Sequence, residues 1–136
     1  MRIRKRVAAV LLSAAFVGGT MAIAPTAQAN EPNQGAAASC YGSAKSYSKP
    51  DGSGYYPAGS ATLTTTSNCS DINIKPNTNR YIAVCWVPSS GQVSCQAEYK
   101  LATGGQWNVI ATNVQTGTRF YFVFRSTALS NGSWAA

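Results

Sequence analysis

Four cysteines constrain the fold of this chain more than any other feature. Cys40, Cys69, Cys85 and Cys95 lie 29, 16 and 10 positions apart. An even number of cysteines in a short secreted chain predicts two disulfides, which stabilise a domain whose core is small. A zinc site is the alternative, but it needs ligand pairs two to four residues apart, and these spacings contain none. We therefore expect a disulfide-bonded domain without a metal.

Three pairings of the four cysteines are possible in principle. If the segments that hold Cys85 and Cys95 form one hairpin, with a loop at residues 88–92, the two residues face each other across the strands. This arrangement leaves Cys40 to pair with Cys69. The hairpin interpretation thus predicts the bonds Cys85–Cys95 and Cys40–Cys69.

Residues 1–29 have the features of a secretory signal peptide. A basic start, an apolar run at residues 7–24 and the small residues Ala27 and Ala29 follow one another in the expected order. A membrane anchor is the alternative, because 18 residues reach the lower limit for a spanning helix, but Gly18, Gly19 and Pro25 oppose it. We expect the mature chain to begin at Asn30, to be secreted and to have no membrane contact after cleavage.

The basic character of the chain comes largely from this leader. The whole chain carries a net charge of +7, and loss of residues 1–29 leaves seven basic and four acidic side chains, a net charge of +3. The remaining basic residues are scattered and form no run that would neutralise successive phosphates. Nucleic acid is therefore not an expected partner.

The mature chain divides into two regions of different composition. Residues 30–60 are predicted to be a flexible arm followed by a Gly-, Ser- and Tyr-rich loop, with a turn signal at Pro50-Asp51-Gly52. From residue 61 onward, short segments alternate between apolar and polar residues. We therefore expect the β domain to occupy residues 61–136.

Six segments of this region are predicted to be strands: residues 61–65, 71–75, 81–87, 93–101, 107–114 and 118–126. The segment 81–87 is apolar on both faces and should be central, whereas 93–101 alternates over nine residues and should bury one face. The segment 107–114 also fits a helical stripe, but its flanking glycines favour a strand. The last two strands are expected to form a hairpin around Gly117. The predicted fold is all-β, a single small antiparallel β-sandwich or barrel of about six strands.

The sequence contains few side chains that could act in catalysis. The chain has no histidine and only four carboxylates, Glu31, Asp51, Asp71 and Glu98, which fall in four separate segments. Asp51 and Asp71 are the least implausible acids for an enzyme. We expect no catalytic residues, no cofactor and no enzymatic activity.

The aromatic residues suggest a binding role instead. Phe120, Phe122 and Phe124 share one parity and should be core, and Trp86 should be packed. The tyrosines of the Gly/Ser-rich loop combine rigid rings with adaptable backbone, as in binding loops, although a solvated linker would have the same composition. Trp134 either closes the end of the sheet or stays exposed. The candidate binding residues are Tyr47, Tyr55, Tyr56 and Trp134.

These features predict a secreted, non-enzymatic binding protein, one form of which is an inhibitor of an extracellular enzyme. The alternative is a carbohydrate or cell-wall binding module, which would need two exposed, coplanar rings. The expected partner is an extracellular protein or glycan, and the protein is expected to be a monomer.

The segment from Ser70 to Ser126 also carries a resemblance. Its stretches SDINIKP, NRYIAVCWVPSSGQVSCQ and GQWNVIATNVQTGTRFYFVFRS resemble small secreted β proteins of actinobacteria, of the Streptomyces type, to which no function is assigned. The resemblance implies a secreted bacterial β domain with a Cys85–Cys95 bond. It transfers no catalytic residue.

Overall fold

The computed structural model describes residues 38–136, so the predicted signal peptide and the start of the mature chain lie outside the described residues. The described part is nearly all β, which confirms the predicted class, with a short helical turn at residues 38–42. Its ten strands are β1 (Lys45–Lys49), β2 (Tyr55–Tyr56), β3 (Leu63–Thr64), β4 (Ile72–Pro76), β5 (Arg80–Trp86), β6 (Ser94–Cys95), β7 (Lys100–Ala102), β8 (Asn108–Ala111), β9 (Arg119–Phe124) and β10 (Ser130–Ala135).

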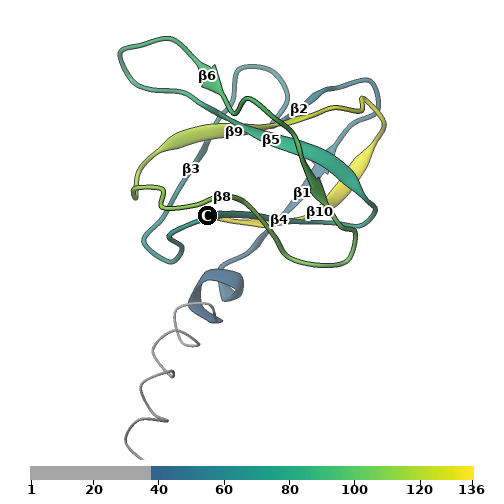
Figure 1. Cartoon of the computed structure of the whole chain (residues 1–136), viewed down its shortest axis with the longest axis horizontal. Coiled ribbons are helices and arrows are strands. Elements are labelled where there is room, and N and C mark those ends of the chain that lie inside the picture. Colours follow the sequence, from purple (N-terminus) through teal and green to yellow (C-terminus); the bar gives the residue numbers. More distant parts are fainter. Residues whose placement is uncertain (1–37) are drawn as a thin grey trace, which may run out of the picture. The chain divides into compact units, whose positions relative to one another are not determined.

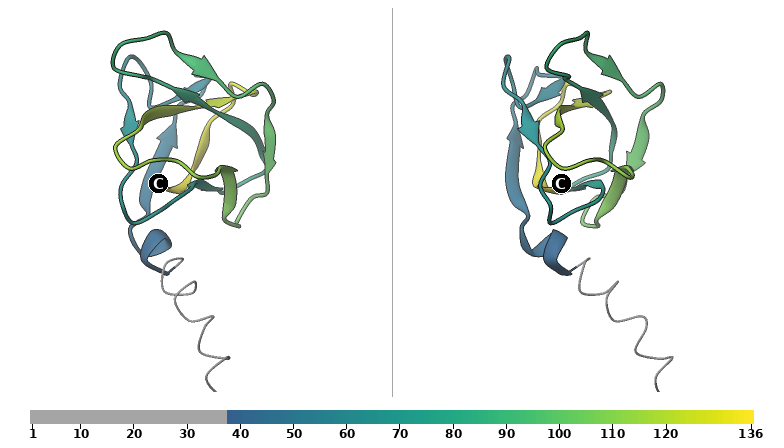
Figure 2. Two further views of the ribbon diagram at one scale, coloured as in Figure 1. Left: turned by 60° about the vertical axis from the view of Figure 1, so that its left-hand side comes forward. Right: turned by 90° about the vertical axis from the view of Figure 1, so that its left-hand side faces the viewer.

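The strands form two antiparallel sheets in a sandwich-like arrangement. The four-stranded sheet has the order β1-β10-β4-β8, and the six-stranded sheet has the order β2-β9-β5-β6, with β3 also paired to β9 and β7 also paired to β5. Figure 1 shows β5 and β9 in one layer above β4, β8 and β10 in the other. In both views of Figure 2, the blue strand β1 and the yellow strand β10 lie side by side, as their pairing requires.

The core lies between the two sheets. Phe120, Phe122 and Phe124 of β9 are buried and pack against isoleucines of β4 and β5, as their shared parity predicts. Trp86 is half-buried at the edge of this cluster. Burial of these side chains away from water is the main force that holds the two sheets together.

Both predicted disulfides are confirmed. Cys40 is bonded to Cys69, and Cys85 to Cys95. Cys85 and Cys95 are direct cross-strand partners of β5 and β6, as the hairpin interpretation requires. The first bond connects the helical turn at residues 38–42 to the loop before β4, so it fastens the start of the described chain to the sandwich.

Five of the predicted strands correspond to β3, β4, β5, β8 and β9, and β5 has strand neighbours on both sides. The nine-residue strand predicted at 93–101 is wrong. The structure has two short strands there, β6 and β7, and Val93, Tyr99 and Leu101, which should have been buried, are exposed. Gln96 interrupts the pattern, because its side chain turns inward, accepts a hydrogen bond from the Val84 amide and donates one to the Ile110 carbonyl.

The predicted hairpin of the last two strands is also wrong. β8 pairs with β4 in one sheet, whereas β9 lies in the other sheet between β2, β3 and β5. Asn113 has a positive φ of 55°, and the Val114 amide donates to the Ser70 carbonyl, so the chain turns away from β8 and crosses to the opposite layer. Gly117, with φ of 88°, completes the turn into β9, as its position predicted.

Three strands were absent from the prediction: β2 lies in the predicted loop, and β1 and β10 form a pair. β1 lies inside the segment predicted to be a flexible loop, and β10 follows the last predicted strand, so the sandwich begins at β1 and not at residue 61. The two strands pair over five residues, from Lys45↔Trp134 to Lys49↔Ser130. Neither shows apolar alternation, because both are rich in serine. Their pairing depends on partners that are distant in sequence.

Candidate functional site

Two of the four candidate binding residues are core. Tyr47 is 4% exposed and Trp134 is 6% exposed, so neither offers a surface to a ligand. Tyr47 faces Gly132 across the β1–β10 pair, and a side chain at Gly132 would collide with the Tyr47 ring. The missing side chain thus makes room for a tyrosine under the sheet. The phenol oxygen of Tyr47 is 2.8 Å from the Ser130 hydroxyl, and burial raises the pKa of this tyrosine.

The two tyrosines of β2 point to opposite sides of the six-stranded sheet. Tyr56 is paired with Phe122 and packs against the core, whereas Tyr55 is paired with Val123 and is 51% exposed. This alternation is the normal consequence of strand geometry. Of the predicted binding residues, Tyr55 is therefore the one that keeps a large accessible surface.

Tyr55 belongs to a row of apolar side chains on the outer face of the six-stranded sheet. The register places it beside Val123, places Ala83 on the other side of Val123, and pairs Tyr121 with Cys85 and Leu101 with Tyr81. We call the following residues the outer strip: Tyr55, Tyr81, Ala83, Leu101, Tyr121, Val123 and the Cys85–Cys95 disulfide.

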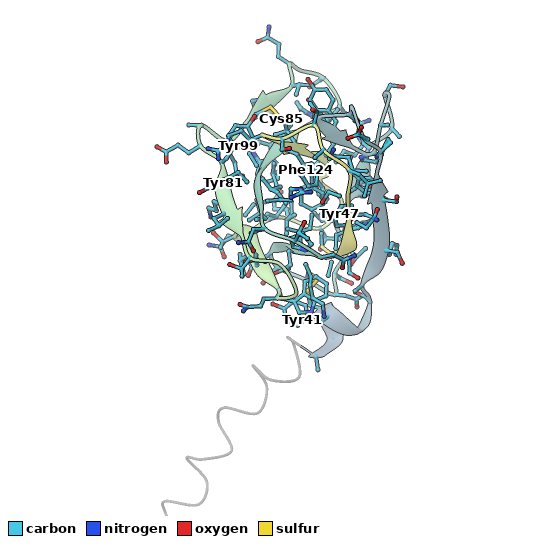
Figure 3. All side chains as sticks on the ribbon, turned by 90° about the vertical axis from the view of Figure 1, so that its right-hand side faces the viewer. Tyr41, Tyr47, Tyr81, Cys85, Tyr99 and Phe124 are labelled. Carbon is cyan, nitrogen blue, oxygen red and sulfur yellow. A yellow bond between two sulfur atoms is a disulfide. The ribbon has the colours of Figure 1, made fainter. Side chains whose placement is uncertain are left out.

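The outer strip presents its large side chains to solvent, whereas its members Ala83 and Cys85 are buried beneath their neighbours. Leu101 is 49% exposed and Tyr81 is 38% exposed, while Tyr121 and Val123 are partly exposed. The Tyr55 and Tyr121 rings meet edge to face, with centroids 5.7 Å apart and planes at 82°. In Figure 3, Tyr81 lies at the margin of the fold, whereas Tyr47 and Phe124 lie within it.

A groove of about 280 Å³ crosses the strip at Tyr121. One wall is the connection between β2 and β3 at residues 59–62, and the other consists of Val87 and Val93 from the β5–β6 hairpin. Tyr55 is part of the lining as well. The loop of this hairpin projects beyond the sandwich in Figure 1, so the groove lies at the base of a protruding element.

A second hollow of about 520 Å³ lies next to the first. It is lined by the half-buried ring of Trp86, by Arg119 and by hydroxyl-bearing residues, namely Ser89, Ser94 and Thr118. The two hollows share Val87 as a wall. The hairpin therefore separates an aromatic groove from a more polar one.

The outer face of the other sheet has a different composition. Ser46 faces Ser133 there, and Ser48 faces Asn131, with a 2.9 Å hydrogen bond from the Ser48 hydroxyl to the Asn131 side chain. The outward side chains of β1 and β10 are thus small and polar. The polar character is limited to this pair of strands, because Val109 of β8 is 41% exposed and Tyr41 stacks on Trp107, with ring centroids 4.6 Å apart, beside the Cys40–Cys69 disulfide.

Lys49 joins the segment that precedes β2 to the segment that follows β9. Its side chain has no exposed surface, and Nζ donates to the carbonyls of Pro50 and Ser53 before β2 and to those of Thr127 and Ala128 after β9. Burial lowers the pKa of Lys49, as does the nearby Arg80 charge, whereas four carbonyl oxygens favour the ammonium form. This one side chain links the two connections that pass between the sheets, β1 to β2 and β9 to β10. We call these connections the two crossings. Their linkage positions β2 against β9.

The carboxylates of the described residues do not gather at either hollow. Asp71 lies before β4, where its side chain accepts a hydrogen bond from the Asn113 amide. Asp51 lies in the turn after β1, and Glu98 between β6 and β7. Among residues 38–136 there is no cluster of three or more His, Cys, Asp or Glu that could hold a metal ion.

Sequence reasoning missed most of the outer strip. Tyr121 and Val123 alternate with the buried phenylalanines, so their outward orientation follows from the same pattern. Tyr81 and Leu101 were assigned to faces expected to be covered. The sequence lacked the signal that this side of the sheet is covered only in part, with Ala83 and Cys85 buried and Tyr81 and Leu101 exposed.

Comparisons of this chain with protein-family models, curated proteins and solved structures found no match. The description of the fold and of the outer strip therefore rests on the structure of this chain alone. Within the part of the chain that the structure describes, no helix has the length and apolar character needed to cross a membrane.

Proposed function

We propose that this protein is a secreted, non-enzymatic binding protein that contacts an extracellular protein through the outer strip. The observation that carries the proposal is the exposure of Tyr55, Tyr81 and Leu101 together on one sheet face, whereas the β1–β10 part of the opposite face carries small polar side chains. Contiguous exposed apolar patches on soluble proteins mark interaction sites, because their exposure to water is unfavourable until a partner covers them. Inhibition of an extracellular enzyme is one form that this binding can take.

Two further features support the proposal. The dispersed carboxylates and the absence of histidine from the sequence leave no acid–base pair beside either hollow. Two disulfides suit an oxidising, extracellular compartment, and the leader predicted at residues 1–29 would deliver the chain there. The mass of the protein recovered from culture medium tests secretion directly, and a mass that still includes the leader contradicts it.

The experiment that tests binding compares two matched variants. Tyr55→Ser removes a ring from the strip, and Leu129→Ser removes an equally exposed side chain, 51% in each case, from the loop between β9 and β10. Both variants are screened with the wild type for inhibition of a panel of purified extracellular proteases and glycosidases, and for binding to the same enzymes on a biosensor.

We expect Tyr55→Ser to weaken any interaction found by at least about fivefold, the loss typical of a contact residue, and Leu129→Ser to leave it unchanged. Equal losses in the two variants would show a general effect of surface hydrophobicity. Wild-type affinity in both would place the contact outside the strip and refute the proposal.

A glycan ligand is the second candidate, and the hollow at Trp86 favours it. An aromatic ring beside several hydroxyl groups and Arg119 can stack on a sugar ring and bond its hydroxyls. Titration with cell-wall oligosaccharides, read by tryptophan fluorescence in wild type and Trp86→Phe, distinguishes the candidates. Quenching that is lost in Trp86→Phe favours the glycan, whereas an unchanged spectrum removes this candidate.

A further inference from the structure

The outer strip has a positive charge at each end. Arg119, Tyr121 and Val123 occupy successive outward positions of β9, and Arg125 continues this alternation directly after the strand, so two apolar side chains lie between two arginines. Both arginines are exposed. Because a strand rises about 3.4 Å per residue, the six-residue separation places the two arginines roughly 20 Å apart.

Backbone hydrogen bonds hold both arginines in the ladder. The Val87 amide donates to the Arg119 carbonyl at 2.9 Å, and the Arg125 amide donates to the Tyr81 carbonyl at 3.0 Å. The guanidinium carbon of Arg125 lies 3.7 Å from the centroid of the Tyr81 ring. A guanidinium on an aromatic face keeps its charge and its outward hydrogen-bond donors, so Arg125 is ordered at the strip.

This charge pattern disfavours a second copy of the chain as the occupant of the strip. In a two-fold symmetric contact the same surface is present on both sides, so an arginine of one copy would lie against an arginine or an apolar side chain of the other. Unpaired like charges at the edge of an interface oppose association.

The ring geometry disfavours an extended glycan on the strip. Tyr55 and Tyr121 are perpendicular and offer no flat platform. One face of the Tyr81 ring is covered by Arg125. The strip is instead complementary to a protein surface that has an apolar centre with carboxylates on both sides of it.

We infer that the outer strip recognises an acidic extracellular protein, whose Asp or Glu side chains pair with Arg119 and Arg125 on either side of an apolar contact. The inference rests on the proposed function and adds the chemistry of the partner. Charge pairs at the rim of an interface accelerate encounter, so binding should weaken as salt screens them.

Random copolymers of amino acids serve as probes while the partner is unidentified. Poly(Glu,Tyr) carries both carboxylates and apolar rings, poly-Glu carries only the charge, poly(Lys,Tyr) reverses the charge, and alginate is a polyanion without a polypeptide. Binding of each is measured by titration of the isotope-labelled mature protein in NMR, which also locates the contact and shows that each variant is folded.

Two double variants remove the same amount of charge from different faces. Arg119→Gln/Arg125→Gln changes the strip, whereas Lys45→Gln/Lys75→Gln changes the four-stranded sheet. We expect poly(Glu,Tyr) to perturb β5 and β9, to bind less tightly as salt rises from about 50 to 300 mM, and to lose at least about fivefold in affinity in the arginine variant but less than about twofold in the lysine variant.

Several results would overturn the inference. Equal losses in the two double variants would indicate attraction to net charge alone, and equal binding of poly-Glu or alginate would indicate a polyanion site. Binding of poly(Lys,Tyr), or of none of the probes, contradicts the required charge. If Tyr55→Ser weakens binding but the arginine variant does not, the proposed function stands and this inference fails, whereas perturbations confined to the four-stranded sheet contradict both.

Discussion

Replacement of Lys49 by methionine tests whether the buried ammonium holds the two crossings between the sheets together. Methionine keeps much of the side-chain length and removes the charge and the donors. Of the four carbonyls that accept from Nζ, Pro50 O also accepts from the Ser53 amide, and Thr127 O also accepts from the Gly52 amide. The substitution therefore leaves the carbonyls of Ser53 and Ala128 without the partner that they have in the native fold.

The expected loss of stability follows from these two carbonyls. A buried polar group that loses its hydrogen bond costs about 1–3 kcal/mol, and the exposed position of Ala128 lets water replace part of that loss. We expect Lys49→Met to lower the free energy of unfolding by about 2–4 kcal/mol. For a domain of this size the melting temperature should fall by at least about 8 °C.

Lys45→Met is the matched control. Lys45 lies on the same strand and has the same parity, but its side chain is exposed, with Nζ 5.9 Å from the centre of the Trp134 ring. We expect its removal to change stability by less than about 0.5 kcal/mol. Urea unfolding measures both variants, and hydrogen exchange at the Gly52 amide reports whether the crossing has loosened. A Lys49→Met variant as stable as Lys45→Met would refute the argument.

Three other perturbations test the fold. Burial raises the pKa of Tyr47, so the stability that the protonated phenol contributes is fully present below the unfolded pKa of about 10. This contribution falls as the pH rises above that value. Urea unfolding between pH 8 and 11 should therefore show a smaller loss of stability at alkaline pH in Tyr47→Phe than in wild type. Gly132→Ala would drive a methyl group into the Lys75 carbonyl and the Tyr47 ring, and we expect a loss of about 3 kcal/mol or more, whereas Gly42→Ala, which meets no atom within 4 Å, should be nearly neutral in the same assay. Replacing Cys85 and Cys95 together by alanine should lower the free energy of unfolding by about 2–3 kcal/mol and leave the other disulfide intact in a peptide map, and an unchanged stability would show that the hairpin needs no covalent bond.

The outer strip shows how far a strand pattern can lead. The alternation in β9 predicts which residues share a face, and it separated the phenylalanines from Tyr121 and Val123 correctly. It cannot tell which side of a sheet another layer will cover. Residues 93–101 show the same limit, because Val93 and Leu101 were predicted to be buried and lie at the surface.

The sequence by itself determined the all-β class, both disulfides and most central strands. These features depend on local periodicity, on turn residues and on the parity of two cysteines in one hairpin, which are properties of neighbouring residues. Tertiary structure decided the rest. β1 and β10 are strands because each is the other's partner across more than 80 residues, and their pairing buries Tyr47, Trp134 and the ammonium of Lys49. A serine-rich segment carries no local signal for such a partner, since hydrogen bonds between distant strands form only when the whole chain has folded.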